Sequence, residues 1–505
     1  MEERRRIRDD IRHAELSRRA MVRGALAVGG LGAFAGLASG CSSSRIIDPK
    51  LVASQPRPAF LLGSSTEVNF EYHNFPIREL RDGIRPYHMS TAVPLTDPGT
   101  HDSSGVRMAL LGGKLYDHPV GQAQYGLHLI EAHRLTKNAE YLNRARKQAQ
   151  RLIDRRVLHG NGWFYPYPFR YRLHRSEDVY DAPWYSMMAQ GQALSVFCRL
   201  FRVTGEAKWK AAADATFASY LVTPVAGKPW GVYVVDGKLW LEEYPNPKEV
   251  SGDRTYNGHT FSAYGLWDYW VVTKDERAKV LLQGALTTTR DVYGDIANRQ
   301  WRSKYCLRHA NDAGNYHTTH TTQHMQCFAI TGDTAFARIS ESYYTDFPPH
   351  GITGTIMFQP GDHIGYQFDD AGAVTATKPL RLIQPYQAQS KGRVRVKDQR
   401  DIWYEITDGE LAGYHVKEMA GHSYQIGETA PIGYRIARPA SIAQAPLEAY
   451  SLDATGALTS VVTSYRVGDR VSLDRRAVLN GVDHLRLGAG PHTGRWVRYA
   501  AINRS

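Results

Sequence analysis

A threonine-centred turn recurs four times between residues 120 and 340, each time between two stretches of helical periodicity. The turns are Thr136-Lys137-Asn138, Thr204-Gly205-Glu206, Thr273-Lys274-Asp275 and Thr331-Gly332-Asp333, with the threonines 68, 69 and 58 residues apart. The Lys or Gly suits a helix stop, and we expect the residue after it in the first turn of the next helix. Apolar residues recur at helical spacing around the turns. The pattern predicts four αα-hairpins.

Hairpins of such a long period predict an α/α toroid, a closed or nearly closed ring of helices. In such a ring the connections between hairpins lie at one end, and here they are long, roughly 157–183, 221–257 and 294–315. Functional sites are commonly built where long loops converge on a rigid scaffold. A helical solenoid that binds protein is the alternative, but it would not gather carboxylates, phenols and arginine at one end.

After about residue 346 the helical periodicity gives way to an alternating pattern rich in Gly, Val and Thr, with an internal repeat. Residues 365–375 match 449–459, 84 positions on, and Trp403 and Val416 match His484 and Val497, 81 positions on. The repeat predicts two β-modules, each a sandwich or an SH3-like barrel. The expected fold class is therefore α+β multidomain: an (α/α) toroid over 91–346, then β-modules over 347–430 and 431–505.

Residues 1–41 are predicted to be a targeting signal. The twin-arginine pattern SRRAMVRG (17–24) precedes a Gly-rich apolar stretch that is too short to span a membrane comfortably. The run LASGC (37–41) resembles a bacterial lipoprotein box with Cys41 as the lipidated residue, and ordinary cleavage nearby is the alternative. We expect export of the folded protein and a cell-surface, extracytoplasmic lipoprotein of a bacterium. Residues 42–90 are expected to be a tether and an N-terminal cap.

The charge balance favours an acidic partner. The formal net charge is +12, of which residues 1–41 contribute 8 Arg minus 5 acids, or +3. Acidic polysaccharide, anionic lipid and nucleic acid would all suit this charge, but no basic arm beyond the N-terminus favours nucleic acid.

Cys198, Cys306 and Cys327 are widely spaced and flanked by apolar residues, which predicts buried thiols. A Cys306–Cys327 bridge stays open.

Four stretches resemble the catalytic domain of the glucuronyl C5-epimerases, which act on heparosan-type polysaccharides. They are HPVGQAQYGL (118–127), WYSMMAQGQALS (184–195), LEEYP with YNG (241–245 and 256–258), and LRHANDAGNYHTTHTTQHMQ (307–326). The resemblance covers roughly 110–346, and the family's large β-domain after AQYGL has no counterpart. It implies a uronosyl C5-epimerase that acts on an acidic, glucuronate-containing polysaccharide without a cofactor. Membrane contact would come from the lipid anchor alone, and a homodimer is left open.

The resemblance also implies roles for single residues. Glu243 would be the base, Tyr244 its neighbour and Tyr316 the second proton-transfer group, while Tyr305 and Arg308 would contact the uronate carboxylate. The chemistry agrees, because inverting C5 requires removal of a proton α to a carboxylate and its return from the opposite face. A carboxylate suits one face and a phenol of lowered pKa the other. A guanidinium can clamp the enolate, so the scheme needs no metal.

Further candidate substrate contacts lie on the same stretches: Tyr125, Trp184, Tyr185, Gln192, Asn257 and His309. For several candidates, and for Glu242 beside them, a structural role is the alternative to a contact with substrate. Glu242 is read as a structural partner of Glu243, and Trp184 and Tyr185 would equally close the core. His317 and His320 stand at i and i+3 without a third ligand, so hydrogen bonding is favoured over a metal.

Two other functions compete with epimerisation. A polysaccharide lyase removes the same C5 proton and then expels the C4 substituent. A non-catalytic glycan-binding surface lipoprotein would bind without exchanging that proton.

Overall fold

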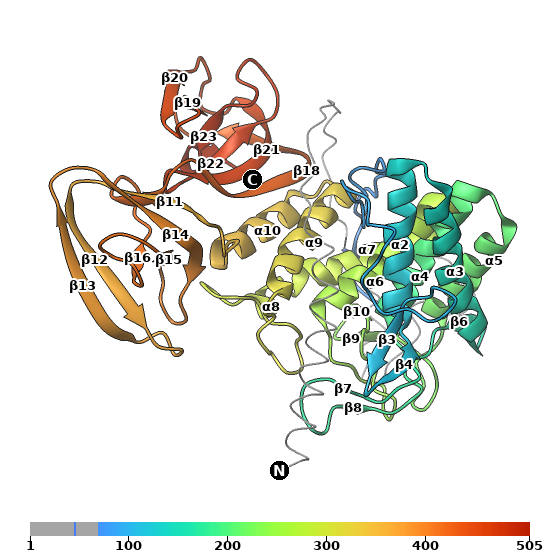
Figure 1. Cartoon of the computed structure of the whole chain (residues 1–505). Helices are drawn as coiled ribbons and strands as arrows, with labels where there is room; N and C mark the ends of the chain where they lie inside the picture. The colour runs from blue at the N-terminus through green and yellow to red at the C-terminus, as the bar shows by residue number, and fades with distance from the viewer. Residues whose placement is uncertain (1–44, 47–68, 505) are drawn as a thin grey trace, which may run out of the picture. The chain divides into compact units, whose positions relative to one another are not determined.

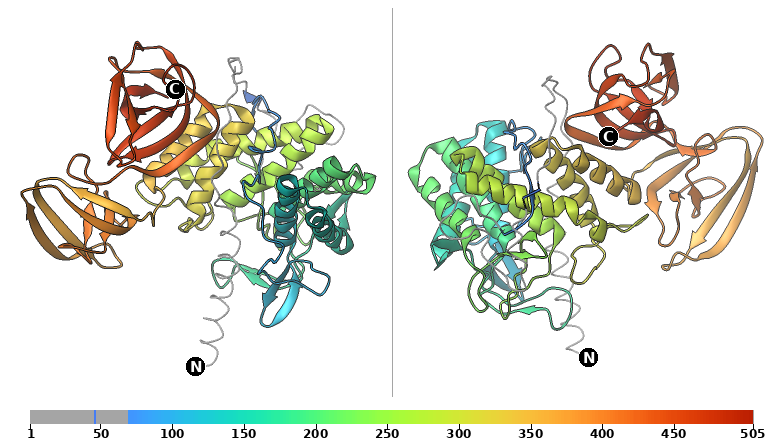
Figure 2. Two further views of the ribbon diagram at one scale, coloured as in Figure 1. Left: turned by 45° about the horizontal axis from the view of Figure 1, so that its top comes forward. Right: turned by 180° about the vertical axis from the view of Figure 1, so that it is seen from behind.

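The computed structural model describes residues 45–46 and 69–504 of the 505-residue chain. The predicted signal, Cys41 and most of the tether therefore lie outside the described residues. The chain divides into two compact units, which are drawn in Figures 1 and 2. The helical unit runs to Ile296 and includes Lys304–Tyr316, and the second unit holds Ala297–Ser303 and the chain from His317 on. Within the described ranges, the helices are all too short or too polar to cross a membrane.

Helical hairpins form the scaffold of the helical unit. Its described residues give α2 (Pro119–Thr136) with α3 (Ala139–Arg155), α4 (Met187–Thr204) with α5 (Ala207–Ala218), and α6 (Tyr256–Thr273) with α7 (Glu276–Asp291). The backbones of helices α4 and α6 approach each other closely at Gly191. A Cβ on this residue would lie only 2.6 Å from the Cα of Ser262. The AQGQA run thus allows a close helix approach that a larger residue would block.

The four threonine turns share one hydrogen-bond pattern. Each threonine hydroxyl donates to the carbonyl four residues earlier at 2.8 Å and accepts the amide two residues later at 3.1–3.2 Å. The Lys or Gly between them has a left-handed φ of 57–73° and ends the helix. The predicted hairpin turns are present at all four positions.

One detail of that prediction is wrong. The residue after the Lys or Gly is the N-cap of the next helix and does not lie in its first turn. The side chains of Asn138, Asp275 and Asp333 accept a backbone N–H of the helix at 2.8–2.9 Å. A short oxygen-bearing side chain is favoured there because it satisfies an otherwise unpaired amide. Glu206 makes no such cap and pairs with Arg146 instead.

Short antiparallel ribbons occupy the connections of the helical unit. They are β3 (Met108–Leu111) with β4 (Lys114–Asp117), β5 (Val157–His159) with β6 (Gly162–Phe164), β7 (Tyr171–Arg172) with β8 (Val179–Tyr180), and β9 (Val232–Val235) with β10 (Lys238–Leu241). At the start, β1 (Arg45–Ile46) pairs with β2 (Tyr72–His73), and α8 (Tyr293–Ile296) follows α7. The long connections are therefore folded, which gives their side chains defined positions.

The fourth hairpin, α9 (Tyr316–Thr331) with α10 (Thr334–Asp346), groups with the β-modules. The unit boundary thus falls at residue 316, although the predicted helical domain ends at 346. The described chain is an α+β multidomain protein with hairpins in both units.

The two β-modules repeat one topology. The first contains β11 (Gly354–Phe358), β12 (Gly361–Phe368), β13 (Val374–Leu382), β14 (Tyr386–Arg395), β15 (Ile402–Ile406), β16 (His415–Lys417) and β17 (Ser423–Gln425). The second contains β18 (Glu428–Ile442), β19 (Glu448–Leu452), β20 (Leu458–Val462), β21 (Arg470–Leu479), β22 (Val482–Leu487), β23 (Trp496–Arg498) and β24 (Ile502–Asn503).

Strand order matches position by position: β13-β12-β16-β15-β14-β11-β17 in one module and β20-β19-β23-β22-β21-β18-β24 in the other. The turn before the second strand of each outer hairpin is also the same. The carboxylates of Asp369 and Asp453 each accept the amides two and four residues later. The internal sequence repeat is therefore a structural repeat, and each module is one continuous antiparallel sheet.

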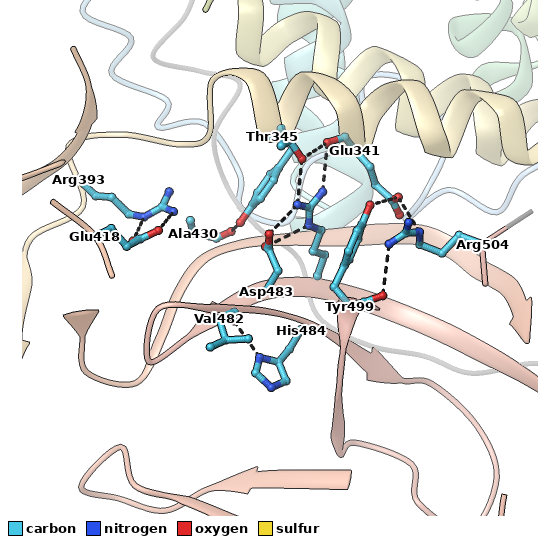
Figure 3. A network of polar contacts seen from close by, with 12 residues as sticks. Glu341, Thr345, Arg393, Glu418, Ala430, Val482, Asp483, His484, Tyr499 and Arg504 are labelled. Carbon is cyan, nitrogen blue, oxygen red and sulfur yellow. Dashed lines mark hydrogen bonds and ion pairs between the residues drawn. The ribbon is translucent and has the colours of Figure 1, made fainter. Parts of the chain in front are cut away.

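A buried polar network joins α10 to the second sheet within its unit (Figure 3). Glu341 is ion-paired with Arg438 and accepts hydrogen bonds from the hydroxyls of Tyr434 and Tyr499. Arg476 donates to the Glu341 carbonyl at 3.1 Å and pairs with Asp483 at 3.1 Å. Because buried charges need partners, this network fixes the helix on the sheet.

Candidate functional site

An aromatic cluster joins two connections of the helical unit. Its members are Tyr167, Phe169, Tyr171, Tyr180, Trp184 and Tyr244. The rings of Trp184 and Tyr167 stack with centroids 3.8 Å apart, and the indole N–H of Trp184 donates to the carbonyl of Phe169 at 3.0 Å. The hydroxyl of Tyr180 donates to the carbonyl of Tyr244 at 3.1 Å. These contacts tie the 157–183 connection to the WLEEYPNPKEVSGDRTYN stretch, which we call the Glu-Glu loop (residues 240–257).

The aromatic candidates occupy the cluster in different ways. Trp184 is 5% exposed and stacked on its neighbours, so it closes the core. Tyr244 is also buried, with its ring 5.8 Å from that of Tyr171 at an angle of 15°. Tyr185 is half-buried, and its ring packs edge-on against Phe164. For Trp184 the sequence left open stacking on a sugar or packing in the core. The structure shows it packed in the core.

Glu242 is fully buried and holds the Glu-Glu loop together. Its carboxyl accepts the backbone N–H of Arg254 at 3.0 Å and that of Tyr244 at 3.3 Å. A Cβ on Gly252 would lie 2.0 Å from its Oε2, so only glycine fits there. Burial, reinforced by the charge of Asp253, raises the pKa of Glu242 to about 8. Glu242 therefore keeps its proton at neutral pH and is a structural partner of Glu243.

Glu243 lies between the aromatic cluster and the start of α6. Its side chain packs on Gly258, where a Cβ would lie 1.9 Å from Oε2, so the glycine of the YNG motif makes room for the carboxyl group. Burial raises the pKa of Tyr167, and the charge of Glu243 raises it further. This coupling places the carboxylate close to that phenol. Asn257, in the first turn of α6, is buried beside the same glycine.

The third connection supplies two more phenols. The Tyr305 carbonyl accepts the N–H of Tyr256 at 3.1 Å, which anchors the connection to the start of α6. The rings of Tyr305 and Tyr316 lie 5.3 Å apart. Tyr305 belongs to the same apolar core as Trp184 and Tyr244, and the half-buried Tyr316 packs against it. The structure therefore brings the predicted residues of three connections together.

Arg308 is exposed and lines a hollow of about 490 Å³. The other lining residues include Arg254, Tyr233 and Glu249, but not Glu243. Burial raises the pKa of Tyr180, whereas the positive charge of Arg308 opposes that rise. Arg308 therefore lies at the border of the aromatic cluster and lines, with Arg254, a hollow on the Glu-Glu loop whose lining also holds Asp236 and Glu249.

His309 is enclosed by carboxylates. Its Nδ1 lies 2.6 Å from Oδ1 of Asp253 and its Nε2 lies 3.1 Å from Oδ2 of Asp178. With both ring nitrogens engaged and the side chain 4% exposed, it does not offer the predicted substrate contact. His174 lies 3.4 Å from Asp253, and the free thiol of Cys306 is buried nearby. Sequence analysis missed His174, Asp178 and Asp253, because they are scattered over separate connections without a local motif.

Two further candidates lie in other surroundings. The ring of Tyr125 packs against His101 and under Arg107, at 5.5 and 4.6 Å. Gln192 is fully buried inside α4. A substrate would have to displace packed helices to reach Gln192, so we do not retain it as a contact.

His317 and His320, in the second unit, are engaged in hydrogen bonds. The Nδ1 of His317 accepts the Ser303 amide at 2.9 Å, and the Nδ1 of His320 lies 2.8 Å from the Ser303 hydroxyl. Hydrogen bonding, the interpretation favoured for His317 and His320 from the sequence, is therefore what the structure shows. The cysteines Cys198, Cys306 and Cys327 are buried, as predicted, and form no disulfide with one another, so the Cys306–Cys327 bridge is not formed.

Fold and site together define a helical domain in which acidic and phenolic side chains lie on the connections between hairpins. Residues 159–345 match the family described as D-glucuronyl C5-epimerase C-terminus. This range contains Glu243, Tyr305, Arg308 and Tyr316. The resemblance found in the sequence is confirmed over this range, which is similar to the C-terminal part of the glucuronyl C5-epimerases.

The matched relatives cover only part of the molecule. A D-glucuronyl C5-epimerase of Caenorhabditis elegans is 32% identical over 85 residues, which are 17% of this chain and 13% of the relative. The chain thus spans about one eighth of the curated relative that it matches.

Among solved structures, cellobiose 2-epimerase from Spirochaeta thermophila has a TM-score of 0.35 at 14% identity, covering 48% of this chain and 63% of that one. A family 76 mannosidase from Bacteroides thetaiotaomicron has a TM-score of 0.25 at 15% identity, covering 39% and 48%.

Proposed function

We propose that the protein is a uronosyl C5-epimerase acting on an acidic, glucuronate-containing polysaccharide. Two observations carry the proposal: Tyr305 and Tyr316 pack on the apolar core that holds Tyr167, and the charge of Glu243 acts on the phenol of Tyr167. All of these residues lie inside the range that matches the epimerase family. Glu243 removes the C5 proton α to the uronate carboxylate, and the phenol of Tyr316 returns a proton to the opposite face. The net result is inversion at C5 with the polymer intact.

The protonation of Glu242 supports Glu243 as the base. Burial, reinforced by the charge of Asp253, raises the pKa of Glu242 to about 8, so this neighbour is neutral at pH 7. A neutral neighbour does not repel the carboxylate that the proposal requires on Glu243. The buried carboxyl also fixes the loop from which Glu243 projects, through its bonds to the amides of Tyr244 and Arg254.

Positive charge near the cluster supports an anionic substrate. Removing the C5 proton places a second negative charge on the uronate carboxylate, and a guanidinium lowers the cost of that charge. Arg308 and Arg254 line one hollow on the Glu-Glu loop, and the chain has a net charge of +12. A polymer with its reacting sugar at the aromatic cluster would have neighbouring uronates to pair with these two guanidiniums, although Asp236 and Glu249 line the same hollow.

The proposal extends to features that rest on sequence pattern. The hairpins α2–α3, α4–α5, α6–α7 and α9–α10 would close into an α/α toroid with the connections at one end. The chain would be exported by the twin-arginine route, and a lipid on Cys41 would anchor it at the cell surface. Proteolytic accessibility on intact bacteria, compared for the natural chain and Cys41→Ser, tests the anchor.

Isotope exchange tests the reaction. The purified protein is incubated with heparosan and other uronate polymers in D2O, and the C5 proton is followed by NMR together with chain length. We expect deuterium at C5 with intact chains, and Glu243→Gln to slow the exchange by about 10²- to 10⁴-fold. The matched control is Glu276→Gln, an exposed carboxylate in the first turn of α7, which leaves the rate unchanged.

Two outcomes would overturn the proposal. An unsaturated uronate chromophore with shortened chains would show a lyase. Binding of the polymers without any exchange, unaffected by Glu243→Gln, would show a glycan-binding protein.

A further inference from the structure

Four potential metal ligands meet beside the aromatic cluster. They are His174, Asp253, Cys306 and His309, whose ligand atoms all lie within 4.8 Å of one another. The Sγ of Cys306 lies 3.8 Å from Nε2 of His174 and 3.9 Å from Nδ1 of His309. The Nε2 of His174 lies 3.4 Å from Oδ2 of Asp253. We call these residues the four-ligand cluster.

Three of these separations are close to the edges of a tetrahedral zinc site. With Zn–N and Zn–O bonds of about 2.0–2.2 Å and Zn–S bonds of about 2.3 Å, tetrahedral ligands stand roughly 3.3–3.6 Å apart. The three distances involving His174 or Cys306 agree within a few tenths of an ångström. The contact between Asp253 and His309, at 2.6 Å, is instead a direct hydrogen bond, so these two groups must separate by about 0.7 Å.

Outer contacts orient the cluster as they do in metal proteins. The Nε2 of His309 faces Oδ2 of Asp178 at 3.1 Å, which leaves Nδ1 to point into the cluster. Asp178 itself accepts the Arg175 amide at 3.0 Å, and the hydroxyl of Thr255 donates to Oδ2 of Asp253 at 2.8 Å. A carboxylate behind a ligating imidazole and a donor on a ligating carboxylate are the usual partners of such ligands.

We propose that the four-ligand cluster binds one Zn²⁺ ion. A thiolate, a carboxylate and two neutral imidazoles would balance the two positive charges, so the buried site would carry no net charge. The side chains are at most 9% exposed, and all four tetrahedral positions come from the protein. A site without an open position is structural, so the ion takes no part in proton transfer.

Zinc at this position would tie three connections together. His174 comes from the connection after α3, Asp253 from the Glu-Glu loop, and Cys306 and His309 from the connection after α7. Tyr305 and Arg308 lie within the segment that the last two ligands anchor, and Glu243 lies on the loop anchored by Asp253. The ion therefore stabilises the relative positions of these side chains.

Metal content and cobalt spectroscopy test the site. The full chain, purified without a polyhistidine tag, is assayed for zinc by mass spectrometry, and zinc is then replaced by Co²⁺. We expect one metal ion per chain, visible bands of tetrahedral intensity and a near-ultraviolet thiolate-to-cobalt band. Cys306→Ser should abolish the thiolate band, whereas Cys198→Ser, a second buried thiol of the helical unit, should retain it.

A gentler variant covers the case in which Cys306→Ser fails to fold. Asp178→Asn should keep the stoichiometry and the thiolate band but weaken zinc binding about 10- to 100-fold in competition with a chromogenic chelator. A chain that carries no zinc and takes up Co²⁺ without a thiolate band would overturn the site and show a purely hydrogen-bonded cluster. None of these readouts involves a glycan, so the metal site and the epimerase activity fail or succeed separately.

Discussion

Glu131 and Glu242 are both fully buried in the helical unit, yet their surroundings are opposite. Glu131, in α2, is paired with Arg85, with Arg134 at 2.9 Å and with Arg199 at 3.9 Å. Burial alone would raise the pKa of Glu131, but the three guanidiniums outweigh it and lower that pKa. Glu242, on the Glu-Glu loop, is held by backbone amides and a phenol, and burial raises its pKa to about 8.

The contrast separates a structural region from a candidate reactive one. Around Glu131 the charges neutralise each other, and Arg199 also pairs with Asp268 at 2.9 Å, so the helices are clamped. Among the described residues, no arginine side chain is ion-paired with Glu242, and burial leaves the pKa of Glu242 raised. Shifted pKa values of this kind are typical of functional sites.

The largest expected effect is at the clamp. Glu131→Gln removes a carboxylate that pairs with three arginines, and the guanidiniums of Arg85 and Arg199 stay buried with one counter-charge fewer. The free energy of unfolding should therefore fall by about 3–5 kcal/mol. Urea unfolding of the helical unit, followed by tryptophan fluorescence, measures it. Glu140→Gln is the control, because its pair with Arg144 is at the surface and contributes under about 1 kcal/mol. Equal losses in the two variants would contradict the clamp.

Arg308 differs from the clamped arginines by being exposed. Arg308→Ala should therefore change the free energy of unfolding by less than about 0.5 kcal/mol. It should slow C5 exchange by about 10²-fold or more, since it removes a cation from the charge that develops on the substrate. Exchange rates and urea midpoints are measured on the same samples. A variant that loses stability but keeps its rate would place Arg308 among the structural arginines.

The proton on Glu242 predicts a pH dependence. Between pH 4.5, the ordinary pKa, and about pH 8, the folded state holds one proton more than the unfolded state, so unfolding free energy falls as pH rises. Below pH 4.5 both states are protonated and the contribution is fully present. Glu242→Gln lacks this titration and should gain roughly 3 kcal/mol relative to the natural chain between pH 5 and pH 8. Parallel stability curves for the two chains would refute the raised pKa.

The smallest effect is expected at a surface carboxylate, which provides the baseline for both regions. Asp275 caps α7 by accepting the Arg277 amide at 2.8 Å. Asp275→Ala should cost about 1 kcal/mol, and Asp275→Asn much less, because the amide oxygen still caps the helix. Thermal unfolding of the two variants measures the difference. If Asp275→Ala lost as much unfolding free energy as Glu131→Gln, burial of the carboxylate would not determine the size of the loss.

Local chemistry was readable from the sequence. The threonine turns were predicted because a threonine, a Lys or Gly that suits a helix stop and a following polar residue are neighbours in the chain, although the N-cap role of that polar residue was not predicted. The β-module repeat was predicted for the same reason, since a duplicated turn such as Asp369 and Asp453 keeps its local hydrogen bonds. Glu243, Tyr305 and Tyr316 were found through family motifs; the structure packs the two tyrosines on one apolar core and couples Glu243 to Tyr167 of the same core.

Long-range neighbours were not readable. Nothing near His309 in the sequence indicates that Asp178 and Asp253 enclose it, and nothing in the AQGQA run shows that Gln192 is buried while Tyr185 is half-exposed. The predicted helical boundary at 346 likewise missed that α9–α10 packs with the sheets through Glu341. Each of these depends on which distant segments meet.

By itself, the sequence determined the hairpin turns, the paired β-modules and the side chains suited to proton transfer, because each depends on residues within a few positions of one another. The tertiary structure decided which carboxylate keeps its proton, which histidine is enclosed and which connections share an aromatic cluster. Desolvation and charge coupling act through space and not along the chain, so these properties emerge only once distant segments are packed.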